Sequence, residues 1–178
     1  MFCNVRLAAT VSWRERERKR TSPRKPGFDY STPGNYFITA RLRPYMHELA
    51  EIDDGCSCLT DFGRIVEWCW HDLPNHYGNV ELDAFVVMPD HIHGIIRLLD
   101  LSAVIMNPPG LPEVVRGLKT SSSRRINNLL DARGMSIWAP SFHDRIIRTD
   151  DALIAARQYI RNNPVNWVRT YDAKKHPT

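Results

Sequence analysis

The chain has 178 residues, of which 43% are hydrophobic, enough for one domain with an ordinary core. No hydrophobic run approaches the roughly 18 residues of a membrane-spanning helix, so we expect no membrane segment. Lysine and arginine outnumber aspartate and glutamate by 24 to 20. The resulting net charge of +4 suits a polyanionic partner.

The cysteines and the first residues favour a reduced, cytoplasmic protein. Asn4 and Arg6 interrupt the apolar positions near the start, which is not typical of a secretory signal. Cys56 and Cys58 are spaced C-x-C, without a second pair at zinc-site spacing. A structural disulfide set is therefore not expected.

Residues 1–26 are predicted to form a basic, flexible N-terminal arm. Lysine and arginine dominate the segment from Arg14 to Lys25, which indicates either a solvated arm or one that contacts phosphates. Residues 27–170 are predicted to form the folded domain, and residues 171–178 a C-terminal tail.

The first half of the domain shows three strand patterns and one helix pattern. Aromatic and β-branched residues predict a strand over 36–42, and the acidic stretch 51–55 is predicted to be a loop. Apolar residues at helical spacing predict a helix over 61–71. Two further strands, 80–88 and 91–99, are expected on either side of a tight turn.

The second half is predicted to contain a helix over 113–130, a short strand over 145–148 and a last helix that begins near 149–151. We expect this last helix to end by Asn163, because Pro164 disfavours helical geometry in the residue before it. The order of elements predicts an α+β fold with a mostly antiparallel sheet and packed helices. The ferredoxin-like split arrangement fits this order best.

A His-x-His pair stands at the start of the strand predicted over 91–99. Alternation along a strand puts His91 and His93 on one face and Ile92 on the other. Two neutral imidazoles at that separation form half of a site for a transition metal or magnesium. Two ordinary surface histidines would show the same pattern, so the pair alone does not decide.

A second group of polar residues lies near the end of the last predicted helix. Tyr159 and Asn163 are four residues apart and therefore share one helix face. A tyrosine in such a position is commonly an aromatic at the edge of the core. Tyrosine hydroxyls have a pKa of about 10 and need a metal or a charged group to act as nucleophiles.

Four segments in this order, 27–39, 87–93, 141–148 and 159–164, resemble the REP-associated tyrosine transposases. These proteins are relatives of the single-tyrosine insertion-sequence transposases in the HUH endonuclease superfamily. The resemblance runs from about Arg24 to Trp167 and so includes most of the chain. His143 falls in one of these segments, and we assign it no catalytic role.

The resemblance implies that Tyr159 is the nucleophile and that His91, His93 and Asn163 bind a divalent metal ion, Mg²⁺ or Mn²⁺. It implies cleavage and rejoining of single-stranded DNA at palindromic hairpin repeats, through a 5′-phosphotyrosine and a free 3′-hydroxyl. The implied partner is single-stranded or hairpin DNA, bound by a monomer or a homodimer. A basic, polar group of residues is expected to contact this DNA, although a solvated surface would look similar: Lys119, Ser121, Arg124, Arg125 and Arg161.

Two other functions fit parts of the pattern. A non-cleaving DNA-binding regulator derived from such an enzyme would not need all four of the implied site residues. A nucleotide hydrolase of the histidine-triad type would need a third alternating histidine, and that position is Ile95.

Overall fold

The computed structural model describes residues 27–46, 48–101, 103–104 and 106–175, and only the backbone of 169–175. The predicted basic arm, residues 1–26, lies outside the described residues. Four strands form one antiparallel sheet in the order β4-β5-β1-β6. The strands are β1 (Gly34–Arg41), β4 (Val80–Val87), β5 (His91–Leu98) and β6 (His143–Ile147).

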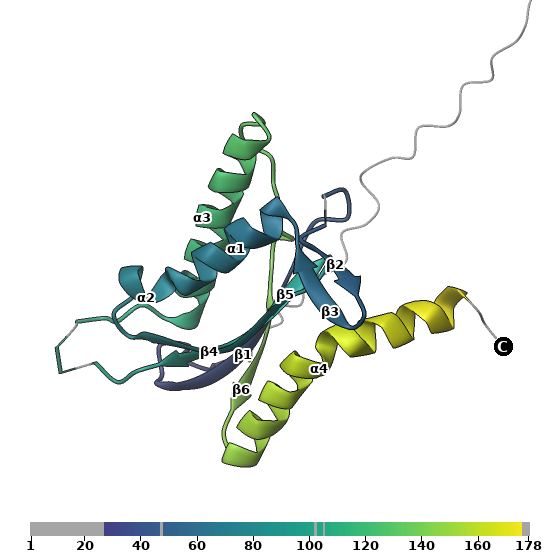
Figure 1. The fold of residues 1–178 in the computed structure, drawn as a ribbon. Coiled ribbons are helices and arrows are strands. Elements are labelled where there is room, and N and C mark those ends of the chain that lie inside the picture. The colour runs from purple at the N-terminus through teal and green to yellow at the C-terminus, as the bar shows by residue number, and fades with distance from the viewer. Residues whose placement is uncertain (1–26, 47, 102, 105, 176–178) are drawn as a thin grey trace, which may run out of the picture.

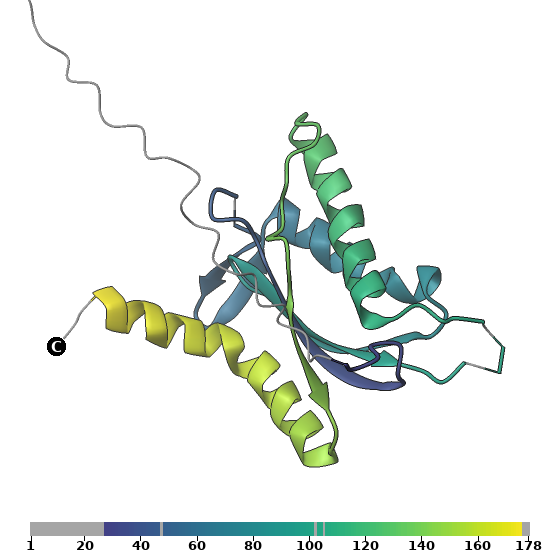
Figure 2. The same cartoon turned by 180° about the vertical axis from the view of Figure 1, so that it is seen from behind.

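Helices cover both faces of this sheet. Figures 1 and 2 show α1 (Asp61–His71), α2 (Leu73–His76) and α3 (Leu111–Leu129) on one face, and α4 (Asp150–Lys175) on the other. The strands β1, β4, β5 and β6, with α1 and α3 as connections, follow the order strand, helix, strand, strand, helix, strand. This is the ferredoxin-like split arrangement, so the predicted α+β fold class is confirmed.

The two faces of the sheet carry separate hydrophobic cores. The larger core lies under α1 and α3, where Ile38 and Ile92 are fully buried with Trp70. Gly94 makes this packing possible, because a Cβ there would lie 2.3 Å from the Trp70 ring. The smaller core joins the sheet to α4 and contains Ile95, Ile147, Ala156 and Ile160. Most predicted elements lie within two residues of their expected bounds because both core patterns are regular.

The predicted loop over residues 51–55 is wrong. Two short strands, β2 (Ala50–Asp53) and β3 (Cys56–Leu59), pair there as a hairpin. Asp54 and Gly55 form its turn at φ angles of 45° and 71°, the left-handed region that a two-residue hairpin turn requires. The turn reaches α4, since a Cβ on Gly55 would lie 3.0 Å from Cγ2 of Val165.

The predicted end of the last helix at Asn163 is also wrong. The helix α4 continues through Pro164 to Lys175, so residues 171–175 of the predicted tail are helical. Figure 1 shows that α4 bends partway along its length, as expected for a helix with an internal proline. An internal proline costs a helix roughly 3 kcal/mol, and both Asn163 and Pro164 are buried at this point.

In the part of the chain that the structure describes, no helix is both long and apolar enough to cross a membrane. Cys56, Cys58 and Cys69 carry free thiols, and only that of Cys69 is buried.

Candidate active site

The strand β5 places the two histidines on the face of the sheet that α4 covers. Their side chains alternate with Ile92, which points into the larger core. His91 and His93 are only 5% and 6% exposed, and their Nε2 atoms lie 3.0 Å apart. The pair is therefore part of a buried cluster rather than two ordinary surface histidines.

Neighbouring side chains form hydrogen bonds with the Nδ1 atom of each imidazole. Asp90 Oδ1 lies 2.5 Å from Nδ1 of His91, and Oγ1 of Thr39 lies 2.8 Å from Nδ1 of His93. A carboxylate can only accept, so Nδ1 of His91 carries the hydrogen, and in the neutral form of this imidazole Nε2 presents a lone pair. Thr39 can donate or accept, which lets His93 direct either an N–H or a lone pair toward His91.

The electrostatics of the site favour a neutral His93. Burial, followed by the nearby charge of His91, lowers the pKa of His93 to about 3. The hydrogen bond from His91 lowers the pKa of Asp90, which keeps that carboxylate ionised. A neutral imidazole with a carboxylate behind its neighbour is the usual state of histidines that bind a cation.

Tyr159 projects from α4 beside this pair. Its ring centroid lies 5.3 Å from that of His93 and 5.8 Å from that of Phe37, in edge-to-face contacts. The side chain is 49% exposed, so its hydroxyl is accessible to a large substrate. Two residues earlier, Arg157 donates to both carboxylate oxygens of Asp83 at 2.6 to 3.1 Å and ties α4 to β4.

Asn163 and Trp167 continue the same face of α4. They follow Tyr159 at steps of four residues, and the ring of Trp167 lies 5.7 Å from that of His91. Asn163 is 8% exposed and sits one helical turn from each of these two contacts, so it faces the histidine pair. Within the described residues, it makes no hydrogen bond to either histidine. The sequence analysis missed Trp167, although its spacing from Tyr159 and Asn163 was a signal.

The site offers only a small number of protein ligands to a divalent ion. No group of three or more His, Cys, Asp and Glu side chains gathers at one point among the described residues. The two Nε2 atoms lie together and Asn163 is on the adjoining face of α4, so a divalent ion here would take most of its ligands as oxygens from water or a phosphate.

A cavity of about 460 Å³ opens beside Tyr159 and His93. The strands β1, β5 and β6 form one side of it, and α4 forms the other. Its lining residues are Phe37, Thr39, His93, His143, Asp144, Arg145, Ala155, Ala156 and Tyr159. His143 pairs with Thr39 in the sheet and therefore shares the face of the histidine pair.

The residues predicted to contact DNA are not brought together at this site. Four of them lie on α3, across the sheet from α4. Lys119 donates to the carbonyl oxygens of Ala139 and Ser141 at 2.7 and 2.9 Å, and burial lowers its pKa to about 8. Ser121 accepts from the Cys69 thiol at 3.6 Å, and the Arg125 guanidinium lies 3.9 Å from the Trp68 ring centre.

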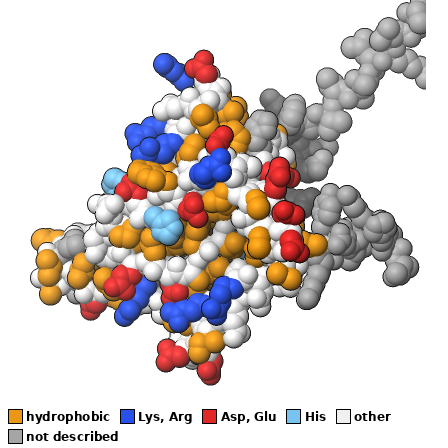
Figure 3. Space-filling view, in the orientation of Figure 1, with side chains coloured by type: hydrophobic (Ala, Val, Ile, Leu, Met, Phe, Trp, Pro, Cys, Tyr) orange, Lys and Arg blue, Asp and Glu red, His pale blue; other side chains and the backbone are white. Residues whose placement is uncertain are grey.

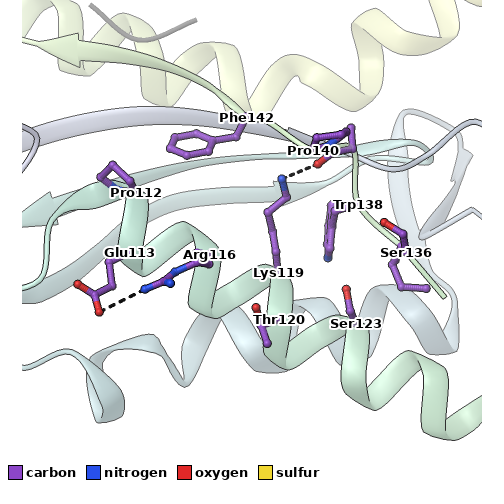
Figure 4. A pocket seen from close by; sticks show the side chains of 12 residues that line it. Pro112, Glu113, Arg116, Lys119, Thr120, Ser123, Ser136, Trp138, Pro140 and Phe142 are labelled. Atoms are coloured by element: carbon purple, nitrogen blue, oxygen red, sulfur yellow. Dashed lines mark hydrogen bonds and ion pairs between the residues drawn. The ribbon is translucent and has the colours of Figure 1, made fainter. Parts of the chain in front are cut away.

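Arg124 on α3 and Arg161 on α4 are exposed, so their charges are available to a partner. Figure 3 shows the molecule from the side seen in Figure 1. On that visible face, lysine and arginine side chains form separate small groups and no continuous basic surface. A second cavity, of about 720 Å³, lies between α3 and the segment 136–142 (Figure 4). Lys119 and Trp138 line it, together with Arg116, which forms an ion pair with Glu113 at 3.6 Å.

Comparisons with known proteins show the family and the fold of this chain. A family model described as "Transposase IS200 like" matches residues 71–163, a range that includes all four residues of the implied metal and tyrosine site. An uncharacterized protein of Haemophilus influenzae (strain ATCC 51907 / DSM 11121 / KW20 / Rd) is 30% identical over 166 residues, 83% of this chain and 89% of that protein. The fold is similar to that of a REP-associated tyrosine transposase bound to a REP hairpin, with a TM-score of 0.58 and 22% identity. That match covers 80% of this chain and 73% of the other.

Proposed function

Because the chain belongs to the IS200-like transposase family, we propose that it cleaves single-stranded DNA with the hydroxyl oxygen of Tyr159. The phenol proton is released and the oxygen attacks the scissile phosphorus. The bond from phosphorus to the 3′ oxygen breaks, and the departing oxygen takes up a proton to become a 3′-hydroxyl. The 5′ phosphate stays on the tyrosine, so its ester bond is retained for rejoining to another strand end.

The observation that carries this proposal is the position of Tyr159 beside a buried histidine pair. Its ring touches that of His93, while its own side chain is half exposed toward solvent. A core-edge tyrosine would not need two buried imidazoles whose free nitrogens point at one another. The alternative, a DNA-binding regulator that does not cleave, gives no reason for this arrangement.

The remaining residues orient the reacting groups. His91, His93 and Asn163 would hold a divalent ion, Mg²⁺ or Mn²⁺, which supplies Lewis-acid polarisation of the scissile phosphate when bound. Asp90 and Thr39 fix the rotation of the two imidazoles from behind. Arg157, through Asp83, holds the helix at the height that brings Tyr159 over the sheet.

We infer that the substrate is single-stranded or hairpin DNA. The similar fold of a transposase bound to a REP hairpin supports this class of ligand, as does the net charge of +4. Arg124, Arg125 and Arg161 are the predicted DNA contacts that are exposed, and of these Arg125 is stacked on Trp68. Lys119, Ser121 and Arg125 already have partners within the protein, so we expect them to act mainly by supporting the surface of α3.

The variant Tyr159→Phe tests the proposal. It removes only the hydroxyl, so binding of a hairpin oligonucleotide should change less than about twofold while cleavage falls below detection, because no nucleophile remains. Denaturing gels of labelled DNA would follow both the cut strand and the covalent adduct. An adduct formed by the phenylalanine variant would place the nucleophile elsewhere.

A further inference from the structure

The cavity beside Tyr159 is larger than the tyrosine and histidines need for their own packing. It measures about 460 Å³ and runs between β6 and the first half of α4. Two consecutive alanines, Ala155 and Ala156, line it from the helix, and their short side chains leave the space open. Cavities of this size take small organic groups in other proteins.

The walls of the cavity combine an aromatic surface with a cation. Phe37 lies at its base, in ring contact with both His93 and Tyr159. Arg145 pairs with Phe37 in the sheet, and its guanidinium stands 5.9 Å from the ring centre. By comparison, the Arg125 guanidinium lies only 3.9 Å from the centre of the Trp68 ring. Arg145 is therefore packed less closely on Phe37 than Arg125 is on Trp68.

The charge of Arg145 is also available to a ligand. Its side chain is exposed, and it forms no ion pair with any carboxylate in the described part of the chain. An exposed arginine beside an aromatic ring can move to cover a flat group that enters between them, and the contact gains from cation–π attraction. The exposed imidazole of His143 adds a hydrogen-bonding group on the same strand.

We propose that this cavity binds the base of one nucleotide next to the scissile phosphate, stacked on Phe37 and covered by Arg145. This inference rests on the proposed function, since it takes single-stranded DNA as the substrate. A base seated here is adjacent to Tyr159, so its own backbone brings the neighbouring phosphate to the hydroxyl and the histidine pair. The cavity is thus a positioning and specificity site for cleavage.

An abasic scan tests the proposal. A hairpin oligonucleotide with single-stranded flanks would carry an abasic sugar at each position around the cleavage point in turn. Loss of one stacked base should slow single-turnover cleavage by about 5- to 150-fold at a single position flanking the cut, with little effect farther away. Cleavage that is equally fast along the whole scan would overturn the inference and leave the proposed function standing.

A variant that fills the cavity supplies the matched test. Ala155→Leu is compatible with a helix, and its longer side chain occupies the space of the base. It should slow cleavage of intact DNA by a similar factor and leave cleavage of the critical abasic DNA unchanged. Ile154→Leu, at an exposed neighbouring position outside the cavity, is the control. An equal loss on both substrates would show that the leucine acts otherwise, and the inference would fail.

A binding measurement decides the matter even if no DNA is cut. In the Tyr159→Phe protein, 2-aminopurine would replace each base near the cleavage point, and stacking on Phe37 should quench its fluorescence at one position. Adding Ala155→Leu to this protein should restore the fluorescence. Bound DNA without quenching at any position would also overturn the inference, whereas absent cleavage with normal quenching would count against the proposed function alone.

Discussion

Single side chains decide which nitrogen each histidine offers to the space between them. Asp90 holds a hydrogen on Nδ1 of His91, so in the neutral form of this imidazole the Nε2 lone pair faces His93. Two lone pairs at 3.0 Å repel each other, so the pair needs either a shared hydrogen or a shared cation. Thr39 allows both, because its hydroxyl can accept from or donate to His93.

Asn163 is the proposed metal ligand that comes from α4, and its substitution tests the metal site. Asn163→Ala should reduce cleavage at least tenfold at low Mn²⁺ and recover as Mn²⁺ is raised, because one oxygen ligand is lost. Asn162→Ala, at the exposed neighbouring position, should behave as wild type. Cleavage rates over a metal titration would measure the effect, beside melting curves without metal.

Asparagine at the end of a helix commonly acts as a cap, which would be a structural role for Asn163. The helix continues for three turns beyond it, so no helix end is there to cap. A lower melting temperature of Asn163→Ala with an unshifted metal titration would nevertheless exclude the ligand role.

At the scale of elements, the first half of α4 depends on one ion pair for its position. Arg157 and Asp83 form two parallel hydrogen bonds and are partly exposed, with 43% and 24% of their side chains accessible. Arg157→Met should lower the free energy of unfolding only slightly, because partly exposed ion pairs contribute little to stability. Cleavage should fall further than this loss explains, because Tyr159 is two residues away.

Chemical denaturation and single-turnover cleavage would measure the two effects of Arg157→Met, with Gln158→Met as the exposed control. The hydrogen bond from Arg157 lowers the pKa of Asp83, so the pair contributes stability at neutral pH. This contribution is lost as the pH falls through the lowered pKa. Wild type and Arg157→Met should therefore approach each other in stability in acid, and a constant difference would contradict the assignment.

The segment 139–141 depends in a similar way on Lys119 of α3. Burial lowers the pKa of its ammonium to about 8 from the usual 10.5, so the unfolded chain binds the proton more tightly. Stability from this group must then rise as the pH increases from about 8 to 10.5. The neutral amine still donates two hydrogens to Ala139 and Ser141.

Lys119→Met removes this pH dependence. The unfolding free energy of wild type relative to Lys119→Met should increase between pH 7.5 and pH 10, and urea titrations at both values would measure it. Other groups that titrate in this range are shared by both proteins and cancel. A difference that shrinks with pH would show that the charged form is the one the fold favours.

Regular patterns made most elements predictable, and local turn chemistry explains the failures. The alternating run from His91 and the spaced apolar residues of α1 and α4 carry strong periodicity. The β2–β3 hairpin is short, and its Asp54-Gly55 turn was the only strong signal. The continuation of α4 past Pro164 depends on contacts with that hairpin, which no local pattern contains.

The candidate site was predictable in its residues and not in its surroundings. The spacing of Tyr159 and Asn163 and the His-x-His pair could be read directly from the chain. The cavity under Arg145 arises because β6 pairs with β1, a contact between residues more than a hundred positions apart. Lys119 was predicted to contact DNA, whereas in the fold it is partly buried. The segment that buries it lies twenty residues later in the chain, so the sequence around Lys119 contains no sign of it.

For the whole molecule, the histidine pair and α3, which carries the exposed Arg124, lie on opposite faces of one sheet (Figures 1 and 2). A substrate that reaches both must be bent or branched, which a hairpin with single-stranded flanks can be and a plain duplex cannot. We expect hairpin DNA to bind at least tenfold more tightly than duplex of equal length. Affinity should fall steeply with salt, because phosphate contacts release counterions.

Fluorescence anisotropy at several salt concentrations would measure this preference. Deleting residues 1–22, which carry more basic than acidic side chains, should flatten the salt dependence if that segment contacts phosphate. An unchanged slope would assign the phosphate contacts to the folded domain. Equal affinity for duplex and hairpin would contradict the expectation that the DNA contacts both faces of the sheet.

The two hydrophobic cores differ in size, and they hold different parts of the chemistry. The histidines stand on a sheet secured by the larger core, whereas the helix of the nucleophile is held by the smaller one, Arg157 and the hairpin turn. Layers with few buried contacts open before the rest of a protein does. Moderate heating should therefore produce molecules that no longer cleave DNA although most of the fold is retained. In these molecules Tyr159 has moved away from the histidines while the sheet remains intact.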